Sequence, residues 1–384
     1  MQLSVTSVAL SKDETTVYTG GKDCILMKWD LRTGKRVKFP GRRKTKRDKQ
    51  AAQLKKKTKG FTAAVGAGGS RAGGMVENYG IEGHHEEVLA VAVSGDSDLV
   101  ASGGRDKIVR IWDPKNNKEI DSFVGHRNDI TGMEFQKNSN TLFTCSLDRT
   151  LKIWSVAEGA YVDTLFGHQT GVHDVDSVPS GKERAVSVGL DRTARVWKIP
   201  EASQLVYRGQ ATNLSLDCIK CVNDSWFLTG GQDGSISLWN AGRKKPVETV
   251  ENAHGEGNWI ASLAVLRNSD LAASGSGDGF VRLWRVRCKP GDRGITEIGS
   301  IPIAGFVNGL EFAPTGRFLV AGVGQEHRLG RWWRIPKVKN GIRVIHFGVS
   351  IDDAKTIPVA SEKLLENGHG GTQAEESESH SDSD

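Results

Sequence analysis

Histidine, a hydroxyl residue and aspartate recur together in this sequence, and these are the residue types of a hydrolase triad. In six places an Asp precedes a Trp by six residues, and a Ser or Thr precedes that Asp by four. His84, Ser102, Asp106 and Trp112 form one complete set. Catalysis needs one exposed and tuned group of residues, whereas this set is repeated along the chain beside a Trp. We therefore expect a structural role and no enzymatic activity.

A chain of hydrogen bonds accounts for the four residue types. A buried indole N–H, a hydroxyl, an imidazole and a carboxylate can satisfy one another, and each is costly when buried alone. We expect Trp112, Ser102, His84 and Asp106 to join a strand to a turn in this way. The same role is expected for three further sets, which are His126, Thr144, Asp148 and Trp154; His168, Ser187, Asp191 and Trp197; and His254, Ser274, Asp278 and Trp284.

The elements that must position these residues are short β-strands. The stretch LVASGGRDKIVRIWD (residues 99–113) contains two alternating apolar runs around a Gly-rich turn, which is typical of a hairpin. The Trp residues follow one another after 83, 42, 43, 42 and 45 residues, and Trp333 follows after 49 more. A period near 42 with Gly-His and Trp-Asp marks is typical of a WD-repeat β-propeller. We predict an all-β, seven-bladed propeller over residues 1–349.

Blade one is predicted to have strands near residues 3–10, 16–20, 25–30 and 35–39. The first strands of blades two to four are predicted at 88–93, 130–135 and 172–178. Blade five has Gln210 where His is expected. Blade seven departs most, with Gly322 in the hydroxyl place, Glu326 or His327 in the Asp place and one residue too many before Trp333. We expect residues 342–349 to supply its fourth strand and so to close the ring.

Charge is concentrated in two appendages. Residues 35–59 hold thirteen Lys or Arg and one Asp, whereas the last eleven residues hold five acids, which leaves the propeller itself near neutral. We expect a disordered basic insert at about residues 40–76 and a disordered acidic tail at 350–384, because neither segment can bury much apolar surface. The insert lies between two blades, where it would hang over the rim that carries the Asp turns.

Several classes of function are disfavoured by composition. No run approaches 18 apolar residues, so we expect no membrane span. Five cysteines at irregular spacing suit a reducing compartment, and Cys218 and Cys221 form a lone CxxC in a strand pattern, which we interpret as two core thiols. We expect no metal, cofactor or small-molecule substrate.

Two groups of residues are candidates for contact with RNA. Crowded like charges in the insert would be relieved by a polyanion, so we expect RNA contact or a targeting role there. These basic residues are Arg42, Arg43, Lys44, Lys46, Arg47, Lys49, Lys55, Lys56, Lys57 and Lys59. The second group is expected on the rim, where Arg328 is the first choice for a partner contact. Its other members are Gln325, Glu326, His327, Arg331, Lys22, Arg105, Lys107, Arg149 and Arg192.

Three stretches point to a particular family. QEHRLGRWWRI (325–335), YVDTLFGHQ (161–169) and VWKIPEASQLV (196–206) closely resemble the WD-repeat protein family of the U3 small nucleolar ribonucleoprotein, and the resemblance covers roughly residues 2–349. It implies a non-enzymatic component that binds the box B/C region of U3 RNA beside a small RNA-binding protein. It also implies contact with other proteins of the small-subunit processome, a role in pre-ribosomal RNA processing, and a location in the nucleus and nucleolus.

Family members usually carry a charged N-terminal extension and a strand before the first blade, whereas this sequence opens inside the blade-one pattern. A second class of function stays open beside the RNA-bound scaffold. A protein-only adaptor could present substrates to a ligase or read a peptide. An aromatic-walled pocket in the central channel would favour that alternative.

Overall fold

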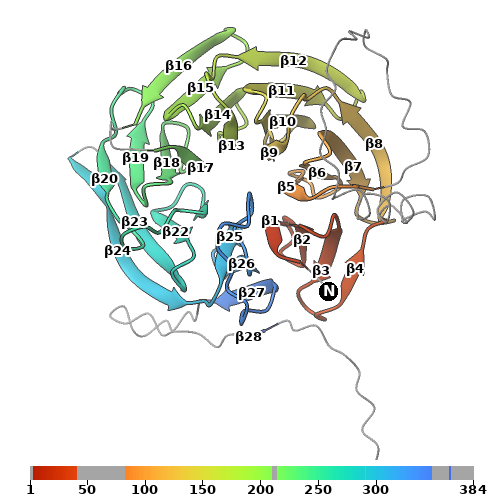
Figure 1. The fold of residues 1–384 in the computed structure, drawn as a ribbon. Coiled ribbons are helices and arrows are strands. Elements are labelled where there is room, and N and C mark those ends of the chain that lie inside the picture. The colour runs from red at the N-terminus through yellow and green to blue at the C-terminus, as the bar shows by residue number, and fades with distance from the viewer. Residues whose placement is uncertain (1–2, 41–82, 210–213, 290, 348–362, 365–384) are drawn as a thin grey trace, which may run out of the picture.

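The computed structural model describes residues 3–40, 83–209, 214–289 and 291–347, together with the backbone of a short strand at 363–364. Seven antiparallel sheets of four strands radiate from a common axis, so the predicted seven-bladed propeller is confirmed (Figure 1). Each sheet is built from four strands that follow one another in the chain. The basic residues expected to bind RNA at 42–59, as well as Gln210, lie outside the described residues.

The strands occupy equivalent places in the seven blades. The innermost strands are β1 (Val5–Leu10), β5 (Val88–Val93), β9 (Ile130–Phe135), β13 (Val172–Ser177), β17 (Leu216–Cys221), β21 (Ser262–Val265) and β25 (Phe306–Phe312). The second strands are β2 (Thr16–Gly21), β6 (Val100–Gly104), β10 (Thr141–Ser146), β14 (Arg184–Gly189), β18 (Trp226–Gly231), β22 (Leu271–Gly275) and β26 (Phe318–Gly324). The first strands predicted for blades two to four therefore agree with the structure to within a residue.

The third strands are β3 (Leu26–Asp30), β7 (Ile108–Asp113), β11 (Thr150–Ser155), β15 (Thr193–Lys198), β19 (Ile236–Asn240), β23 (Phe280–Lys289) and β27 (Gly341–His346). The outer strands are β4 (Arg36–Lys38), β8 (Lys118–Val124), β12 (Ala160–Phe166), β16 (Ser203–Arg208), β20 (Glu248–Val250), β24 (Asp292–Pro302) and β28 (Lys363–Leu364). Inner strands such as β5 are buried along almost their whole length, because other blades cover them on both faces. Outer strands such as β12 are mostly exposed.

The core lies between neighbouring blades rather than inside one sheet. Trp154 of blade three packs in one cluster with Ala101 and Ile111 of blade two, and its ring stacks on Phe123 with a centroid separation of 5.1 Å. The residue after a framework hydroxyl must be small where the next blade approaches. A Cβ on Gly103, for example, would lie 2.7 Å from the Met133 side chain. The large ring of Trp154 and the missing side chain of Gly103 therefore both allow blades two and three to pack closely.

Blade seven differs from the other six blades, because its second and third strands are joined by a long excursion instead of a short turn. We name residues 325–340 the blade-seven loop. β27 pairs with β26 and is the third strand, so 342–349 does not supply the fourth. The fourth strand is β28, which pairs with β27. Trp333 lies in the loop, and Ile345, opposite Leu319, takes the place of the framework Trp.

The register of blade seven also moves its hydroxyl place by one residue. Gly322 pairs with Gly309 directly after the bulge, as Gly20 pairs with Ser7 in blade one. Ala321 therefore stands in the hydroxyl place, and Gln325, four residues later, stands in the Asp place that we expected Glu326 or His327 to fill. Glycine is needed at 322 because a Cβ there would overlap the side chain of Val8 in blade one.

Blades one and seven meet through packing and side-chain hydrogen bonds. Val5 and Val8 share a core cluster with Val320 and Val344. The Asn308 amide donates 2.8 Å to the Val5 carbonyl, and the Ser4 hydroxyl accepts a 3.2 Å hydrogen bond from the Glu326 N–H. The blade-seven loop is thus part of the seam that closes the ring.

Candidate nucleic-acid interface

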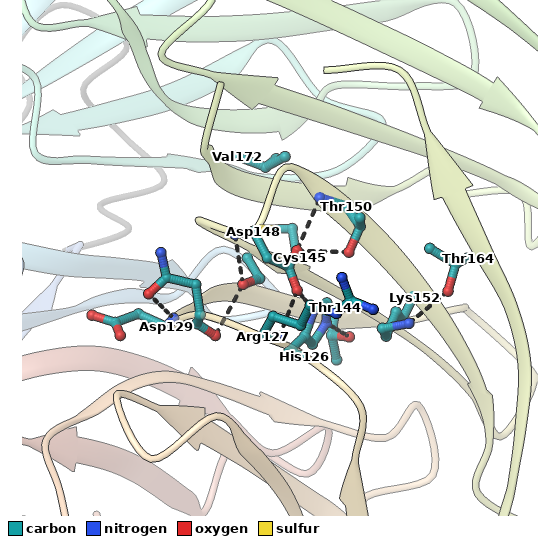
Figure 2. Close-up of polar contacts among 12 residues, drawn as sticks. His126, Arg127, Asp129, Thr144, Cys145, Asp148, Thr150, Lys152, Thr164 and Val172 are labelled. Atoms are coloured by element: carbon teal, nitrogen blue, oxygen red, sulfur yellow. Dashed lines mark hydrogen bonds and ion pairs between the residues drawn. The ribbon is translucent and has the colours of Figure 1, made fainter. Parts of the chain in front are cut away.

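The repeated polar set forms the expected chain of hydrogen bonds in blade three. Figure 2 shows three of its members, His126, Thr144 and Asp148. The Trp154 indole donates 2.9 Å to the Thr144 hydroxyl, and the two ring nitrogens of His126 lie 2.8 Å from that hydroxyl and 2.9 Å from Asp148. Asp148 also accepts hydrogen bonds from Arg127 and Thr150 at the turn. Every polar group in the chain has a partner, so the set joins strand to turn without an unsatisfied buried atom.

The same chain is present in blades two, four and six. Its members are His84, Ser102, Asp106 and Trp112; His168, Ser187, Asp191 and Trp197; and His254, Ser274, Asp278 and Trp284. The hydroxyl side of each set is closed to a substrate, since Ser102, Thr144, Ser187 and Ser274 are 0% exposed. Among the described residues of blades one and five, the last link is present: Trp29 donates to Thr19, and Trp239 donates to Thr229.

Electrostatics fit this structural role. Burial alone would raise the pKa of the Asp148 carboxyl, but hydrogen bonding with His126 and Thr150 holds that pKa below its usual value. The pKa of Asp191 is lowered in the same way by His168. These carboxylates therefore remain charged and keep accepting the imidazole N–H at neutral pH.

The blade-seven loop crosses the channel mouth on the rim that carries the Asp turns. Lys22 of blade one donates 2.8 Å to the Gly330 carbonyl, and Arg105 of blade two donates 2.9 Å to the Leu329 carbonyl. Arg328 reaches into the channel and donates 3.0 Å to the His173 carbonyl of blade four. A single loop is therefore bound to three blades that lie far from its own in the sequence.

These contacts show where the side chains of Arg328 and Lys22 lie, and their contact with a partner stays a prediction. The Arg328 side chain lines the channel, where its guanidinium donates to a backbone carbonyl of the channel wall. Lys22 is buried against the loop. Among the expected rim cations, Lys107, Arg149 and Arg192 are exposed, and each sits at the turn with a positive φ of 64°, 74° and 60°.

Two polar residues organise the interior of the loop. Gln325 donates 2.6 Å to the Val338 carbonyl and accepts a 3.2 Å hydrogen bond from Arg334. Glu326 lies 3.2 Å from the Lys22 ammonium, 3.3 Å from Arg331 and 3.9 Å from Arg334. Their side chains therefore hold the loop in shape, and the predicted contact of both residues with a partner stays a prediction. The guanidinium groups of Arg331 and Arg334 stay largely exposed.

An aromatic cluster lies where the loop meets blade six. Trp259 is in ring contact with Trp332 at 5.5 Å and with Trp333 at 5.7 Å between centroids. His327 packs edge-on against Trp259 and tilted against Trp332. Burial lowers the pKa of His327 to about 4, and the charge of Arg328 contributes to this lowering, so the ring is neutral at pH 7.

Sequence reasoning missed the three Trp residues of this cluster. Trp333 falls close to the period of the framework Trp residues, although no hydroxyl residue stands in the matching place. One sequence signal could have identified the cluster: Trp332 and Trp333 are adjacent and lie between Arg331 and Arg334. The third strand of a WD repeat uses a single framework Trp, so the second Trp and the flanking cations point to another role.

The channel itself is lined by all seven inner strands, with Arg328 at the loop end. At the opposite end, charged side chains from several blades meet. The Arg267 guanidinium lies 2.9 Å from both Glu134 and Asp176. Burial raises the pKa of Glu134 to about 7, although Lys220 and Arg267 oppose that rise. The described residues that line the channel include no aromatic ring.

Both cysteines of the CxxC lie in β17. Cys218 and Cys221 are buried free thiols whose pKa values are raised by burial. The described residues contain no group of three or more His, Cys, Asp or Glu side chains arranged to hold a metal ion. Within the same residues, no helix has the length and apolar character needed to cross a membrane.

Comparison with known proteins supports this architecture. The model of the WD domain, G-beta repeat, matches residues 2–30, 76–113, 117–155, 159–198, 206–240 and 244–285. The U3 snoRNP-associated protein-like EMB2271 of Arabidopsis thaliana is 37% identical over 359 residues, which span 89% of this chain and 69% of the relative. The U3 small nucleolar RNA-interacting protein 2 of Homo sapiens is 38% identical, over 90% of this chain and 67% of its own. The chain belongs to the family of U3 snoRNP-associated WD40-repeat proteins.

The solved structure of U3-55K is similar to this member of the family throughout the ring. It has a TM-score of 0.76 and 37% sequence identity, with 90% of this chain and 96% of that chain covered. The chain spans about two thirds of the length of the curated family relatives named above. The matched WD segments end at residue 285, before the blade that carries the long loop.

Proposed function

We propose that this chain is a non-enzymatic scaffold of the U3 small nucleolar ribonucleoprotein. It binds the box B/C region of U3 RNA together with a small RNA-binding protein and with other small-subunit processome proteins. It acts in pre-ribosomal RNA processing in the nucleolus. Relatives named for interaction with U3 RNA support this role, as does a yeast relative named ribosomal RNA-processing protein 9, which is 27% identical.

The observation that carries the proposal is the blade-seven loop. Its sixteen residues hold five Lys or Arg and one Glu, and anchors on three other blades fix the backbone over one rim. A fixed loop can place cations against a phosphate backbone without the entropic cost of ordering a free loop at binding. The exposed cations Lys107, Arg149 and Arg192 extend the same positive rim.

The basic insert at residues 41–59 supplies the sequence-independent part of the attraction in this proposal. Phosphate contacts by Lys and Arg position a nucleic acid but do not read its sequence. We therefore assign the preference for U3 RNA over other RNAs to the loop and the rim. These would contact a composite surface of the RNA and its small bound protein.

The protein-only adaptor is the weaker alternative. A peptide reader of that kind would need an accessible channel with aromatic walls, whereas Arg328 occupies the loop end of this channel and the described lining residues carry no aromatic ring. The aromatic cluster lies beside the channel, on the rim.

The test is to crosslink the purified full-length chain to total nuclear RNA and to sequence the RNA recovered. Enrichment of U3 RNA with crosslinks at box B/C supports the proposal. Recovery of RNA without U3 enrichment, when the chain is combined with the small partner, contradicts it.

A further inference from the structure

Trp332 and Trp333 are large apolar side chains left open to solvent on a loop that is otherwise firmly held. They are 62% and 54% exposed, although both rings contact Trp259. Framework Trp residues such as Trp112 and Trp239 are almost completely buried. Contiguous exposed apolar patches on a folded surface mark binding sites, whereas single exposed apolar residues are ordinary.

The two rings are held in place from below. His327 is buried, is neutral at pH 7 and contacts both Trp259 and Trp332, and Phe306 packs on the other side of His327. Gly330 allows Trp332 to fold back over the loop, because a Cβ at that position would lie 2.8 Å from the indole ring. The rings are therefore pre-positioned, and binding would not require them to be ordered first.

Charge around the rings selects among occupants. Arg331 and Arg334 flank the Trp pair with more than half of each side chain exposed, and Lys337 follows on the exposed side of the loop. A small pocket beneath the rings is lined by Asn258, Trp259, Ala261, Ser276, Gly277, Phe306, His327, Trp332 and Trp333, and no acid is among these described lining residues. Aromatic faces beside exposed cations suit a flat ring attached to a phosphate.

We propose that Trp332 and Trp333, backed by Trp259, form a stacking platform for unpaired RNA bases, with Arg331 and Arg334 meeting the adjoining phosphates. Every nucleobase has a π-face, so stacking on aromatic side chains binds single strands without reading their sequence. A duplex offers no free base face to such a platform except at its ends. The inference rests on the proposed function and assigns to this rim a preference for single-stranded RNA.

The test uses the purified full-length chain with three RNA probes: a decauridine strand, a blunt-ended duplex of ten base pairs, and U3 RNA. The double variant Trp332→Ala, Trp333→Ala is compared with Phe166→Ala, which removes another exposed aromatic ring, 71% exposed at the end of β12. We expect the double variant to bind decauridine at least about 5- to 100-fold more weakly, because the loss of a single base stack already weakens binding by about that factor. Binding of the duplex stays within about twofold for the double variant, and Phe166→Ala binds all three RNAs like the wild type.

Two further readouts separate stacking from a change of charge or of fold. The slope of affinity against salt stays unchanged in the double variant, since no phosphate contact is removed. The conservative variant Trp332→Phe, Trp333→Phe recovers most of the lost affinity. Decauridine quenches the tryptophan fluorescence of the wild type, and this quenching is reduced in the alanine variant.

If the alanine variant binds decauridine as tightly as the wild type, the stacking platform is overturned and the Trp pair is a protein-docking surface instead. The proposed function would still be supported by U3 binding of the wild type. An equal loss on duplex and single strand also overturns the platform, because the rings would then only hold the loop in shape. Failure of the wild type to prefer U3 RNA contradicts the proposed function alone, since decauridine binding decides the platform separately.

Discussion

The guanidinium of Arg105 donates a 2.9 Å hydrogen bond to the backbone carbonyl of Leu329, which ties blade two to the blade-seven loop across 224 residues of sequence. Lys22 makes the equivalent bond from blade one to the next carbonyl, Gly330. Both cations directly precede the Asp of their turn, the place where we expected a positive rim. Two of the rim cations are therefore used to hold the protein's own loop.

Replacement of Lys22 by Met is expected to loosen the blade-seven loop while the ring stays folded. The change leaves the Gly330 carbonyl and part of the Glu326 carboxylate without their buried partner, which costs about 1–3 kcal/mol. Hydrogen exchange of the amides in residues 326–334 should become faster. Lys107→Met, one residue after its turn Asp and exposed, is the matched control. Equal exchange rates in the two variants would show that Lys22 is not an anchor.

Replacement of Trp154 by Ala is expected to lower the free energy of unfolding by roughly 3–5 kcal/mol, as for a buried aromatic side chain. The change removes the contact between blades two and three as well as the indole N–H that Thr144 accepts. Chemical denaturation measures the loss. The exposed Trp333→Ala is the control and should cost less than about 1 kcal/mol. A loss below about 1 kcal/mol for Trp154→Ala would contradict its framework role.

Acid is expected to weaken the loop through His327. Burial lowers the pKa of this imidazole from 6.5 to about 4; Arg328, Lys22 and His173 also act to lower it, whereas Asp217 raises it. Between these two pH values the unfolded chain binds a proton that the folded chain does not. Stability is therefore present above pH 6.5 and is lost as the pH falls towards 4, by up to about 3 kcal/mol.

The measurement is the free energy of unfolding of the wild type and of His327→Gln at pH 7 and at pH 4.5. Other groups that titrate in this window, including Glu134, are shared by both proteins, so their effects cancel in the difference. The wild type should lose more stability on acidification than the variant. Parallel losses in the two proteins would mean that His327 already takes up its proton in the folded state.

Deletion of residues 41–59 is expected to flatten the dependence of RNA affinity on salt. If about six of its charges meet phosphates, the affinity of the intact chain falls about 10³- to 10⁵-fold between 50 and 200 mM salt. Competition binding with U3 RNA and with an unrelated stem measures both the slope and the preference. The deletion should reduce the slope on both RNAs and leave the preference for U3. If the deletion and the intact chain show the same salt slope, the phosphate contacts are made by the rim and not by the insert.

The repeated part of this protein could be predicted from its sequence, and the part that breaks the repeat could not. His126, Thr144, Asp148 and Trp154 form their chain because a buried polar group needs a partner, and the spacing fixed which partner is in reach. Blade seven offers no such set. Its register depends on a bulge between Val307 and Gly309, and a slip of one residue moves every assignment along the strand.

The direction of Arg328 could not be foreseen for a related reason. Sequence places it in a turn, but whether its side chain points to solvent or into the channel depends on where the loop backbone lies. Anchors on other blades decide that position, since Arg105 and His173 lie 224 and 155 residues away from their partners in the chain. Such contacts leave no local pattern in the sequence.

The seam between blades one and seven gives the ring a second property. The loop that displays the Trp pair also fastens this seam, because the Glu326 N–H donates to Ser4 and its carboxylate pairs with Lys22. Any ligand that binds only the ordered loop must therefore stabilise the closed ring by mass action, by about 2.7 kcal/mol at a hundredfold excess over its dissociation constant. Assembly into a particle would in this way raise the free energy of unfolding of the propeller. The free subunit would unfold more readily and would therefore be degraded faster.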